Sequence, residues 1–382
     1  MIYLDNSATT KPRKEVIEAV DKSMQEGWNN PSALYRPSME VQKAMDKVRE
    51  VCLQNLHCKN GRVIFTSGGT EADNLAILGG LKGIHGGGKV VLSALEHPAV
   101  LNCADEIRRM GFEAVIMPSD RNGLIDTDEL EKMLSDEVRM IVLMQVNNEV
   151  GTIQPLEKII QLKKRKCPDA WVHVDGVQGF LRVPIDMDAL KIDSYAFSGH
   201  KIHAIKGIGA LVVRGDKKIN PLLHGGGQED DLRSGTENTP GIMALGAAVQ
   251  AYHPDDNQRM RELKTRLLNG IRTAIPEAEL NGLLPEDELS SPHILNVSFQ
   301  PVRSQTMLFA LEGDGIYVSA GSACASRKQR ISPVLKAMNV NQARADSAIR
   351  FSLCPFNNAE EIDETVRTLT KHYQMLKKYV RR

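Results

Sequence analysis

The chain has 382 residues, 42% of them hydrophobic, and its 48 basic side chains balance its 48 acidic ones. This length exceeds the size at which a single hydrophobic core usually stops growing, so more than one structural unit is expected. A net charge of zero gives no long-range attraction to nucleic acid or to an anionic membrane, and therefore favours a small or zwitterionic substrate. No stretch approaches the roughly 20 apolar residues that a membrane-spanning helix requires.

The N-terminus and the cysteines indicate a cytoplasmic protein. The first residues lack the basic start and the long apolar region of a signal peptide. The six cysteines include no C-x-x-C pair and no zinc-ligand spacing, which is typical of reduced thiols rather than of a disulfide framework.

Short apolar strands alternate with amphipathic helices from about residue 60 to residue 215. Strands are predicted at 63–66, 89–93, 114–117, 140–146, 171–174, 194–197 and 209–213, with helices at 71–81, 99–110, 127–134 and 159–166. This order predicts an α/β fold with a mostly parallel sheet covered by helices on both faces. Such sheets bind ligands beyond the carboxyl ends of their strands.

A polar, proline-containing stretch at 252–257 predicts a boundary between two units. After it, a helix is expected at 257–275, a strand at 294–299, a helix at 304–311 and a strand at 348–353, followed by a C-terminal helix. We therefore expect an N-terminal segment (1–14) that packs with the smaller unit, a large ligand-binding domain (15–255) and a small α+β domain (256–382).

Polar side chains follow five of the predicted strands, at the edge where a ligand would bind. They are Thr70, His97, Asn148, Asp175 and Lys201. Lys201 follows a buried strand, where loss of water lowers the pKa of an amine and frees it to form a Schiff base with a carbonyl-bearing cofactor. Taken alone, a lysine in this position is more often a solvated surface group.

Two further patterns fit a phosphate-bearing pyridine ring. The run 67–71 (SGGTE) joins a strand to a helix, and its backbone N–H groups and the helix dipole favour one phosphate, although a tight turn with Thr70 as helix cap is equally compatible. His173 and Asp175 share one face of a strand. Asp175 could pair with a pyridine nitrogen. Two alternatives stay open: a metal site formed by His173 and Asp175 with His200 and His203 nearby, and a capping role for Asp175.

Together these features resemble a fold-type-I pyridoxal phosphate (PLP) enzyme, and in particular the cysteine desulfurases of the class V aminotransferase group. The resemblance covers nearly the whole chain, from residues 3–10 (YLDNSATT) through 198–201 (SGHK) to 349–353 (IRFSL). It implies a large domain built on the parallel sheet, a smaller C-terminal domain, PLP as the cofactor and a homodimer with shared active sites.

Residue roles follow from the resemblance position by position. Lys201 would carry PLP, Asp175 would pair with the pyridine nitrogen, and His97 would stack on the ring and assist proton transfer. Arg350 would clamp the substrate carboxylate, because its planar fork binds both oxygens. The other cofactor contacts implied are Gly69, Thr70, Asn148 (also a substrate contact), Gln178, Ser198, Gly199, His200 and Thr236, the last contributed by the other subunit.

Cys324 distinguishes cysteine desulfurases from ordinary aminotransferases. Its small neighbours in 319–326 (SAGSACAS) indicate a mobile loop, and the cations at 327, 328 and 330 favour the thiolate, although from the residues alone a buried structural cysteine is the more common case. The resemblance, to the long-loop subgroup, implies that Cys324 takes sulfur from L-cysteine as a persulfide and releases L-alanine. The sulfur would pass to a protein acceptor for iron–sulfur cluster assembly or tRNA thiolation.

The chain departs from the family pattern at four places. Gly176 replaces a common alanine and predicts a less tightly held ring, while 202–206 (IHAIK), Tyr35 and Cys354 replace other common residues. Two alternatives therefore stay open. One is a related PLP enzyme, such as a selenocysteine lyase or small-amino-acid aminotransferase, in which Cys324 is dispensable, and the other is a sulfur-transfer subunit of low activity.

Overall fold

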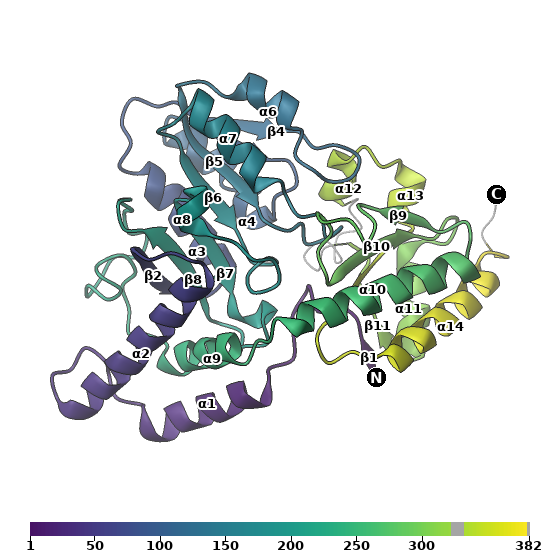
Figure 1. Ribbon diagram of the computed structural model, residues 1–382, viewed down its shortest axis with the longest axis horizontal. Helices are drawn as coiled ribbons and strands as arrows, with labels where there is room; N and C mark the ends of the chain where they lie inside the picture. The colour runs from purple at the N-terminus through teal and green to yellow at the C-terminus, as the bar shows by residue number, and fades with distance from the viewer. Residues whose placement is uncertain (322–331, 380–382) are drawn as a thin grey trace.

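The computed structural model describes residues 1–321 and 332–379, and a seven-stranded sheet organises its larger part (Figure 1). The strand order is β2-β8-β7-β6-β5-β3-β4. In that order the strands are Gly61–Thr66, Gly209–Arg214, Ser194–Ser198, Trp171–Asp175, Val138–Met144, Lys89–Ser93 and Glu113–Met117. Strand β8 is antiparallel to both its neighbours, and the other pairs are parallel. The predicted mostly parallel sheet is confirmed.

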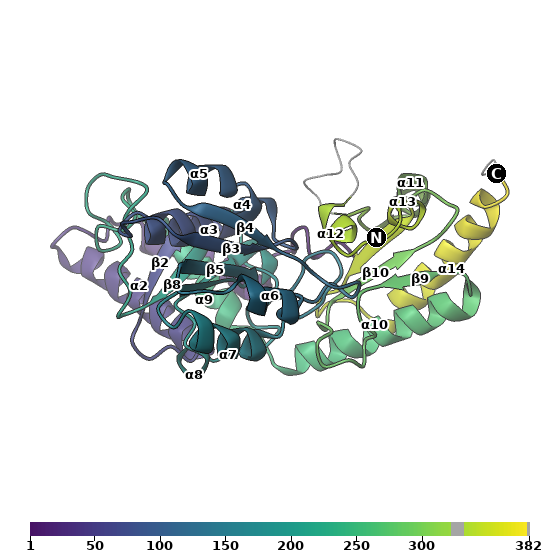
Figure 2. The same cartoon turned by 90° about the horizontal axis from the view of Figure 1, so that it is seen from above.

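Helices cover both faces of this sheet, as Figure 2 shows. On one face lie α3 (Gly69–Asn74), α4 (Pro98–Leu101) and α5 (Ala104–Arg109). The other face carries α6 (Thr127–Met133), α7 (Leu156–Lys166), α8 (Met187–Leu190) and α9 (Thr239–Gln250). Every residue of β6 and β7 is buried, because a parallel sheet between two helix layers has no solvent face.

Two predicted helices are interrupted in the structure. The helix expected at 71–81 is α3 followed by a π-helix, η1 (Leu75–Gly79), and the one expected at 99–110 is divided into α4 and α5. Before the sheet, α1 (Lys14–Glu26) and α2 (Arg36–Asn55) each pack on α9. The sequence predicts no helix before residue 60, so these two helices are an addition to the expected fold.

The second part of the molecule contains an antiparallel sheet, β12-β10-β9. Its strands are Ala348–Ser352, Ile294–Ser298 and Glu279–Asn281, and the helices around it are α10 (Asp255–Ala274), α11 (Ser304–Gly313), α12 (Pro333–Ala337), α13 (Gln342–Asp346) and α14 (Ala359–Leu376). The N-terminal strand β1 (Ile2–Tyr3) pairs in parallel with β11 (Ile316–Tyr317), and Leu4 joins the core of this part. The N-terminal segment therefore lies beside the smaller unit (Figure 1).

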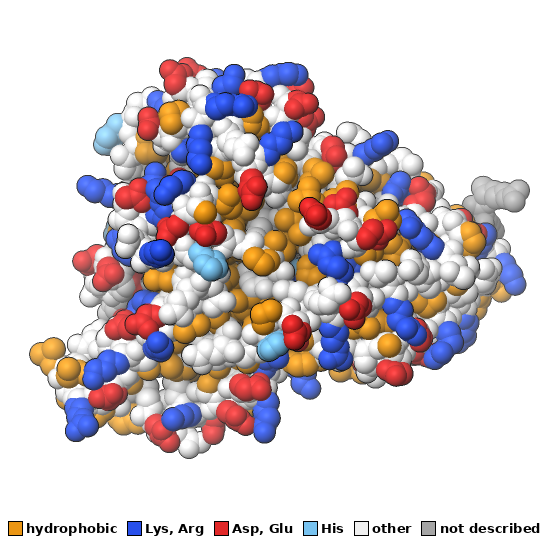
Figure 3. Space-filling view, viewed as in Figure 1, with side chains coloured by type: hydrophobic (Ala, Val, Ile, Leu, Met, Phe, Trp, Pro, Cys, Tyr) orange, Lys and Arg blue, Asp and Glu red, His pale blue; other side chains and the backbone are white. Residues whose placement is uncertain are grey.

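The surface agrees with the balanced composition. On the face seen in Figure 3, basic and acidic side chains are interspersed, and neither sign forms a continuous field. Among the described residues, no helix combines the length and apolarity needed to cross a membrane. The five cysteines in the described part are free and buried.

Candidate active site

One cavity of about 260 Å³ lies beyond the carboxyl ends of β5, β6 and β7, where it meets the start of α3 and the smaller sheet. Most of the residues expected at the site line it, although they come from distant parts of the chain. They are Gly69, Thr70, His97, Asn148, Asp175, Gln178, Ser198, His200, Lys201 and Arg350. The strand order of the large sheet thus brings the predicted site together.

Lys201 ends a short 3-10 turn, η2 (Gly199–Lys201), that directly follows β7. Its Nζ donates to the carbonyl oxygens of Ser7 at 2.5 Å and Ala8 at 2.9 Å. Burial, assisted by the positive charges of Arg350 and Arg182, lowers the pKa of Lys201 to about 7. A neutral amine keeps two hydrogens, so both bonds persist when the proton is lost.

Asp175 is the last residue of β6 and is 5% exposed. Its Oδ1 accepts from the backbone N–H of Val177 at 2.9 Å. Burial, together with the neighbouring Asp73 carboxyl, raises the pKa of Asp175 to about 7. A positively charged partner, such as a protonated pyridine nitrogen, would offset both effects and keep Asp175 ionised.

Asp73, on α3, is a second carboxyl in the same cavity, and the sequence reading did not single it out. Its Oδ1 lies 3.2 Å from Nε2 of His173, and Nδ1 of that histidine lies 2.9 Å from Oγ of Ser194. Burial raises the pKa of Asp73 to about 8 and lowers that of His173 to about 4. His173 is therefore a neutral partner of Asp73.

His97 is the N-cap of α4, and its ring has one defined tautomer. Nδ1 accepts from the backbone N–H of Ala99 at 3.1 Å, and a backbone N–H can only donate, so the proton resides on Nε2. Burial, together with the charge of Lys201, lowers the pKa of His97. The neutral ring lines the cavity beside Lys201 and Asp175.

Gln178 is oriented from two sides. Its side-chain Nε2 donates to the carbonyl oxygen of Ser7 at 3.0 Å, and its Oε1 lies 3.3 Å from Nε2 of His293. His293 is fully buried, and burial holds its pKa well below the usual value, so the neutral ring donates to Gln178. The Ser7 carbonyl oxygen therefore accepts hydrogen bonds from both Gln178 and Lys201.

Four of the expected cofactor contacts surround the start of α3. Gly69 and Thr70 begin that helix, and Ser198 and His200 face it from the end of β7. The turn lies close to β8, because a Cβ atom on Gly209 would be 2.7 Å from Cα of Gly68. Burial lowers the pKa of His200 to about 4, and its Nδ1 lies 3.1 Å from Oγ1 of Thr9.

Arg350 reaches the cavity from the middle of β12 in the smaller sheet, and it is 1% exposed. Its Nη2 donates to Oδ1 of Asp5 at 2.7 Å, and its Nη1 donates to the carbonyl oxygen of Asn148 at 2.9 Å. Its buried Nε has no hydrogen-bond partner among the described residues. A buried donor without a partner is costly, so this face of the guanidinium suits a bound anion.

Two of the expected site residues that the structure describes are not part of this cavity. Gly199 is buried beneath it, and Thr236 is exposed on the loop between β8 and α9. Cys324 lies outside the described residues. The cavity also contains Ser7, Ala8, Asp73, Met144, Val146 and Val177, which had not been predicted. Of these, Ser7 and Ala8 fall within the 3–10 motif and could have been found from it.

The structure also bears on the open alternatives and on the departures. Within residues 1–321 and 332–379, no three His, Cys, Asp or Glu side chains are arranged to hold a metal ion. The unusual stretch after Lys201 is buried at Ile202, His203 and Ala204, and His203 bonds to Thr10 and Lys11 of the N-terminal segment. Cys354 is buried outside the cavity, and burial raises its pKa.

Comparison with known proteins places this arrangement in a family. Residues 2–365 match the family described as "Aminotransferase class-V". A protein named "Cysteine desulfurase IscS" from Methanosarcina thermophila is 38% identical over 380 residues, which cover 98% of this chain and 93% of that relative. A protein of the same name from Dictyoglomus turgidum is 36% identical over 380 residues, with 98% and 95% covered.

Solved structures show the same architecture. One named "NIFS-LIKE PROTEIN" has a TM-score of 0.91 at 33% identity, covering 98% of this chain and 100% of that one. Another, "SspA in complex with cysteine", has a TM-score of 0.79 at 30% identity, covering 94% and 100%.

The helix-flanked parallel sheet, with a lysine enclosed beyond its strand ends, defines an enzyme of PLP fold type I. The chain belongs to the aminotransferase class-V family and, within it, to the cysteine desulfurases. The family resemblance noted in the sequence is confirmed.

Proposed function

We propose that the chain converts L-cysteine to L-alanine with PLP carried on Lys201, and that the sulfur is left as a persulfide on Cys324. One observation carries the proposal: the amine of Lys201, the buried carboxyl of Asp175 and the buried guanidinium of Arg350 meet in one cavity. Amino-acid chemistry on PLP needs a nucleophilic amine, a carboxylate for the ring nitrogen and a fork for the substrate carboxylate.

The donor set fits this cofactor. With a pKa lowered to about 7, the Lys201 amine has a substantial neutral fraction at pH 7, and Asp175 can pair with a pyridine nitrogen. The backbone at Gly69 and the hydroxyls of Thr70 and Ser198 can hold a phosphate. When bound, PLP supplies an electron sink that stabilises negative charge at the α-carbon of the substrate.

The side chains around the cavity bind the substrate carboxylate and transfer the α-proton. Arg350 binds the substrate carboxylate through the donor that has no protein partner, and Asn148, whose carbonyl it already holds, lies beside it. Lys201 takes the α-proton, because an amine with a pKa of about 7 is a base matched to neutral pH. His97, which lines the cavity and carries its proton on Nε2, assists this proton transfer.

Sulfur transfer is the step that we propose for Cys324. Its thiolate attacks the sulfur of the bound cysteine, so that the carbon–sulfur bond breaks and a sulfur–sulfur bond forms. One proton leaves the thiol and one is added at the β-carbon, which makes alanine and a persulfide the balanced products. A protein acceptor, an iron–sulfur scaffold or a tRNA-thiolating enzyme, then takes the sulfur, and capture of the acceptor by the persulfide-loaded protein would identify it.

Replacing Cys324 by alanine tests this function directly. The unmodified protein, given L-cysteine and a reductant, is expected to release sulfide and alanine in equal amounts. Cys324→Ala is expected to lose both at least about a hundredfold, because no nucleophile remains to take the sulfur. Cys354→Ala is the matched control, since that thiol is buried outside the cavity. Full activity in Cys324→Ala would favour a selenocysteine lyase or an aminotransferase instead.

Uptake of PLP by the cofactor-free protein is expected to accelerate as the pH rises through about 7. The amine must be neutral to attack the aldehyde, and the pKa of Lys201 is lowered to about 7 by burial and by Arg350 and Arg182. The absorbance change on mixing with PLP measures the rate. Reaction of PLP with Nα-acetyl-lysine should keep accelerating to about pH 10. A midpoint near that value in the protein would contradict the assignment.

We also propose that the chain works as a homodimer, with Thr236 reaching the cavity of the second copy. Thr236 is exposed here, and the neighbouring Arg233 pairs with Glu71 of α3 at 2.8 Å, so its loop is anchored beside the phosphate end of the site. A second support is a group of exposed apolar side chains around the α1–α2 connection: Met24, Trp28, Leu34, Tyr35 and Met39. Light scattering distinguishes a dimer from the 42.2 kDa monomer.

The division into an N-terminal segment (1–14), a PLP-binding domain (15–255) and a small domain (256–382) is also proposed. It is supported by the separate hydrophobic core that surrounds β10 and β12 and includes Leu4. A smaller cluster, in which Leu95 and Met144 pack with Leu335 and Met338, connects the two parts. Proteolysis that released a stable fragment ending near residue 255 would support this boundary.

A further inference from the structure

Two glycines leave space for two large side chains beneath the turn that follows β6. A Cβ atom on Gly176 would lie 1.8 Å from Cζ and 2.2 Å from Oη of Tyr195, and one on Gly179 would lie 2.0 Å from Oε1 of Gln145. Neither glycine has a positive φ angle. The close approach of Tyr195 and Gln145, rather than the backbone conformation, therefore requires glycine at both positions.

Tyr195 and Gln145 bond to each other and to both ends of this turn. The Tyr195 hydroxyl donates to Oε1 of Gln145 at 2.6 Å and lies 3.4 Å from the carbonyl oxygen of Gly176. Gln145 donates its backbone N–H to the carbonyl oxygen of Asp175 at 2.8 Å and its side-chain amide to that of Val183 at 3.1 Å. Both side chains are almost completely buried, so these bonds are not exchanged with water.

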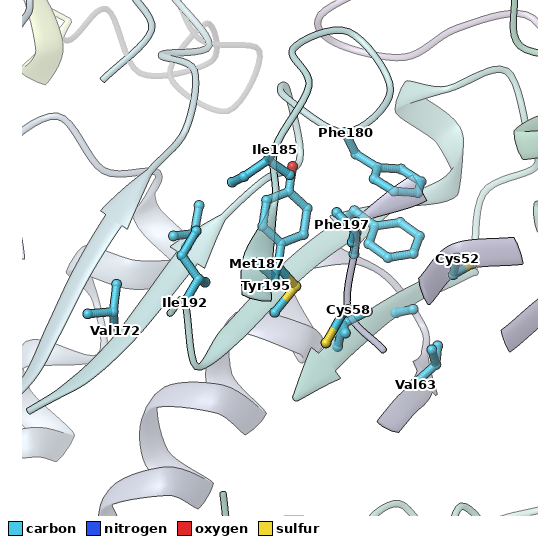
Figure 4. Close-up of a cluster of buried hydrophobic side chains, with 14 of the residues drawn as sticks. Cys52, Cys58, Val63, Val172, Phe180, Ile185, Met187, Ile192, Tyr195 and Phe197 are labelled. Carbon is cyan, nitrogen blue, oxygen red and sulfur yellow. The ribbon is translucent and has the colours of Figure 1, made fainter. Parts of the chain in front are cut away.

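Apolar packing fixes the tyrosine ring from the other side. The ring lies 6.3 Å from that of Phe180, which is itself stacked on Phe197 at 3.9 Å. Figure 4 shows the three rings together among buried aliphatic side chains, with the tyrosine oxygen directed toward Ile185. The position of the Tyr195 hydroxyl is thus determined by a rigid core.

The turn itself presents two of the residues proposed to hold PLP. The backbone N–H groups of Gly179 and Phe180 both donate to the carbonyl oxygen of Gly176, at 2.9 and 2.8 Å. Asp175 precedes Gly176, and Gln178 lies within the turn, with both side chains facing the cavity. A shift of the Gly176 carbonyl would therefore move both side chains.

We propose that Tyr195 is a positioning residue that, with Gln145, fills the space left by Gly176 and Gly179 and holds Asp175 and Gln178 in place. The expected effect on PLP binding rests on the proposed function, whereas the packing of Tyr195 against Gly176 does not depend on it. It also explains why glycine is found at position 176. The space that an alanine methyl group would fill is occupied by the ring of Tyr195 from the neighbouring strand.

A double-mutant cycle tests the proposal on the full-length protein. Gly176→Ala is expected to lower the unfolding temperature of the cofactor-free protein and to weaken PLP binding, because the new methyl group collides with Tyr195. In Gly176→Ala/Tyr195→Leu the collision is removed, so the unfolding temperature should recover most of the decrease seen in Gly176→Ala. The two substitutions are then strongly non-additive, as expected for residues in direct contact.

Tyr195→Phe isolates the hydroxyl, because the ring stays and the Gln145 bond is lost. Its PLP dissociation constant is expected to rise about tenfold, a magnitude typical for a residue that orients a ligand-binding group, with a shifted absorption band of the bound cofactor. Tyr373→Phe is the matched control: this buried tyrosine donates to the carbonyl oxygen of Gln300 at 2.7 Å, in the smaller unit. It should lose stability with unchanged PLP affinity.

Two results would overturn the inference. One is a Gly176→Ala protein that unfolds and binds PLP like the unmodified chain, and the other is a Tyr195→Phe protein that loses no more affinity than Tyr373→Phe. Failure of the proposed function gives a different result in the unmodified protein, which would then either bind no PLP or bind it without releasing sulfide from L-cysteine. The coupling between Gly176 and Tyr195 would still be measurable in its unfolding temperature.

Discussion

Lys201→Ala is expected to reduce the release of sulfide and alanine from L-cysteine by at least about a thousandfold. This variant loses both the covalent attachment of PLP and the base that takes the α-proton. A positioned base alone typically accelerates a reaction about 10²–10⁴-fold. The fold should survive, because truncation removes a buried amine whose pKa is lowered to about 7 by burial and by nearby positive charges. Sulfide and alanine are measured together, with far-UV circular dichroism to verify folding.

Lys264 provides a matched control for this experiment. It is also a buried lysine whose pKa is lowered to about 7 by burial, but its Nζ donates to Oγ of Ser290 and to the carbonyl oxygen of Ser291, both at 2.7 Å, away from the cavity. Lys264→Met is expected to alter stability while the bound cofactor and its absorbance remain. If Lys201→Ala turned over cysteine as fast as Lys264→Met, the proposed mechanism would be wrong.

The sequence predicts the large sheet well because most of its strands are short, mainly apolar runs. Burial on both faces gives β5, β6 and β7 a composition that no exposed strand would have. The direction of β8 could not be predicted in the same way, since an apolar run has the same composition in either direction. Likewise, the break between α4 and α5 depends on tertiary packing rather than on helical periodicity.

Some site residues could be predicted from the sequence, whereas others depend on tertiary contacts. Asp175 and Lys201 were found because they follow buried strands, where a polar residue stands out. Asp73 was missed because it lies within α3, where an acidic residue is ordinary. The contact of Ser7 with Lys201 spans 194 positions and depends on how the N-terminal segment crosses to the large sheet. The motif at 3–10 marks Ser7 as a residue of interest, but no local pattern shows that it contacts Lys201.

Gly176 illustrates a third limit of sequence reasoning. Its missing methyl group predicted a loosely held ring, but the structure places the Tyr195 ring in the vacated space. The substitution lies in the turn after β6 and its compensation on the neighbouring strand β7, 19 positions further on, and a single sequence does not show that they are coupled. The effect on PLP binding stays a prediction that the double-mutant cycle measures.

The second large effect is expected at Arg350, where Arg350→Lys should raise KM for L-cysteine about ten- to a hundredfold with a smaller change in kcat. A lysine ammonium keeps the charge but cannot bind a carboxylate and reach both Asp5 and the Asn148 carbonyl with one planar fork. Hydrogen bonds to charged groups contribute about 1.5–3 kcal/mol, which corresponds to the stated range. Steady-state kinetics with L-cysteine, on protein saturated with PLP, gives both constants.

The two constants decide what Arg350 does. If it recognises the substrate carboxylate, the effect lies in KM, since the interaction is made before the α-proton moves. A loss confined to kcat would instead place Arg350 in the chemical step or in the support of the Asn148 backbone. Arg344→Lys is the matched control, because that arginine also pairs with a carboxylate, Glu279 at 3.0 Å, and donates to Asn281, but outside the cavity. Its substitution should change stability and leave KM as it is, so that a rise in KM restricted to Arg350→Lys reports carboxylate recognition rather than a weakened fold.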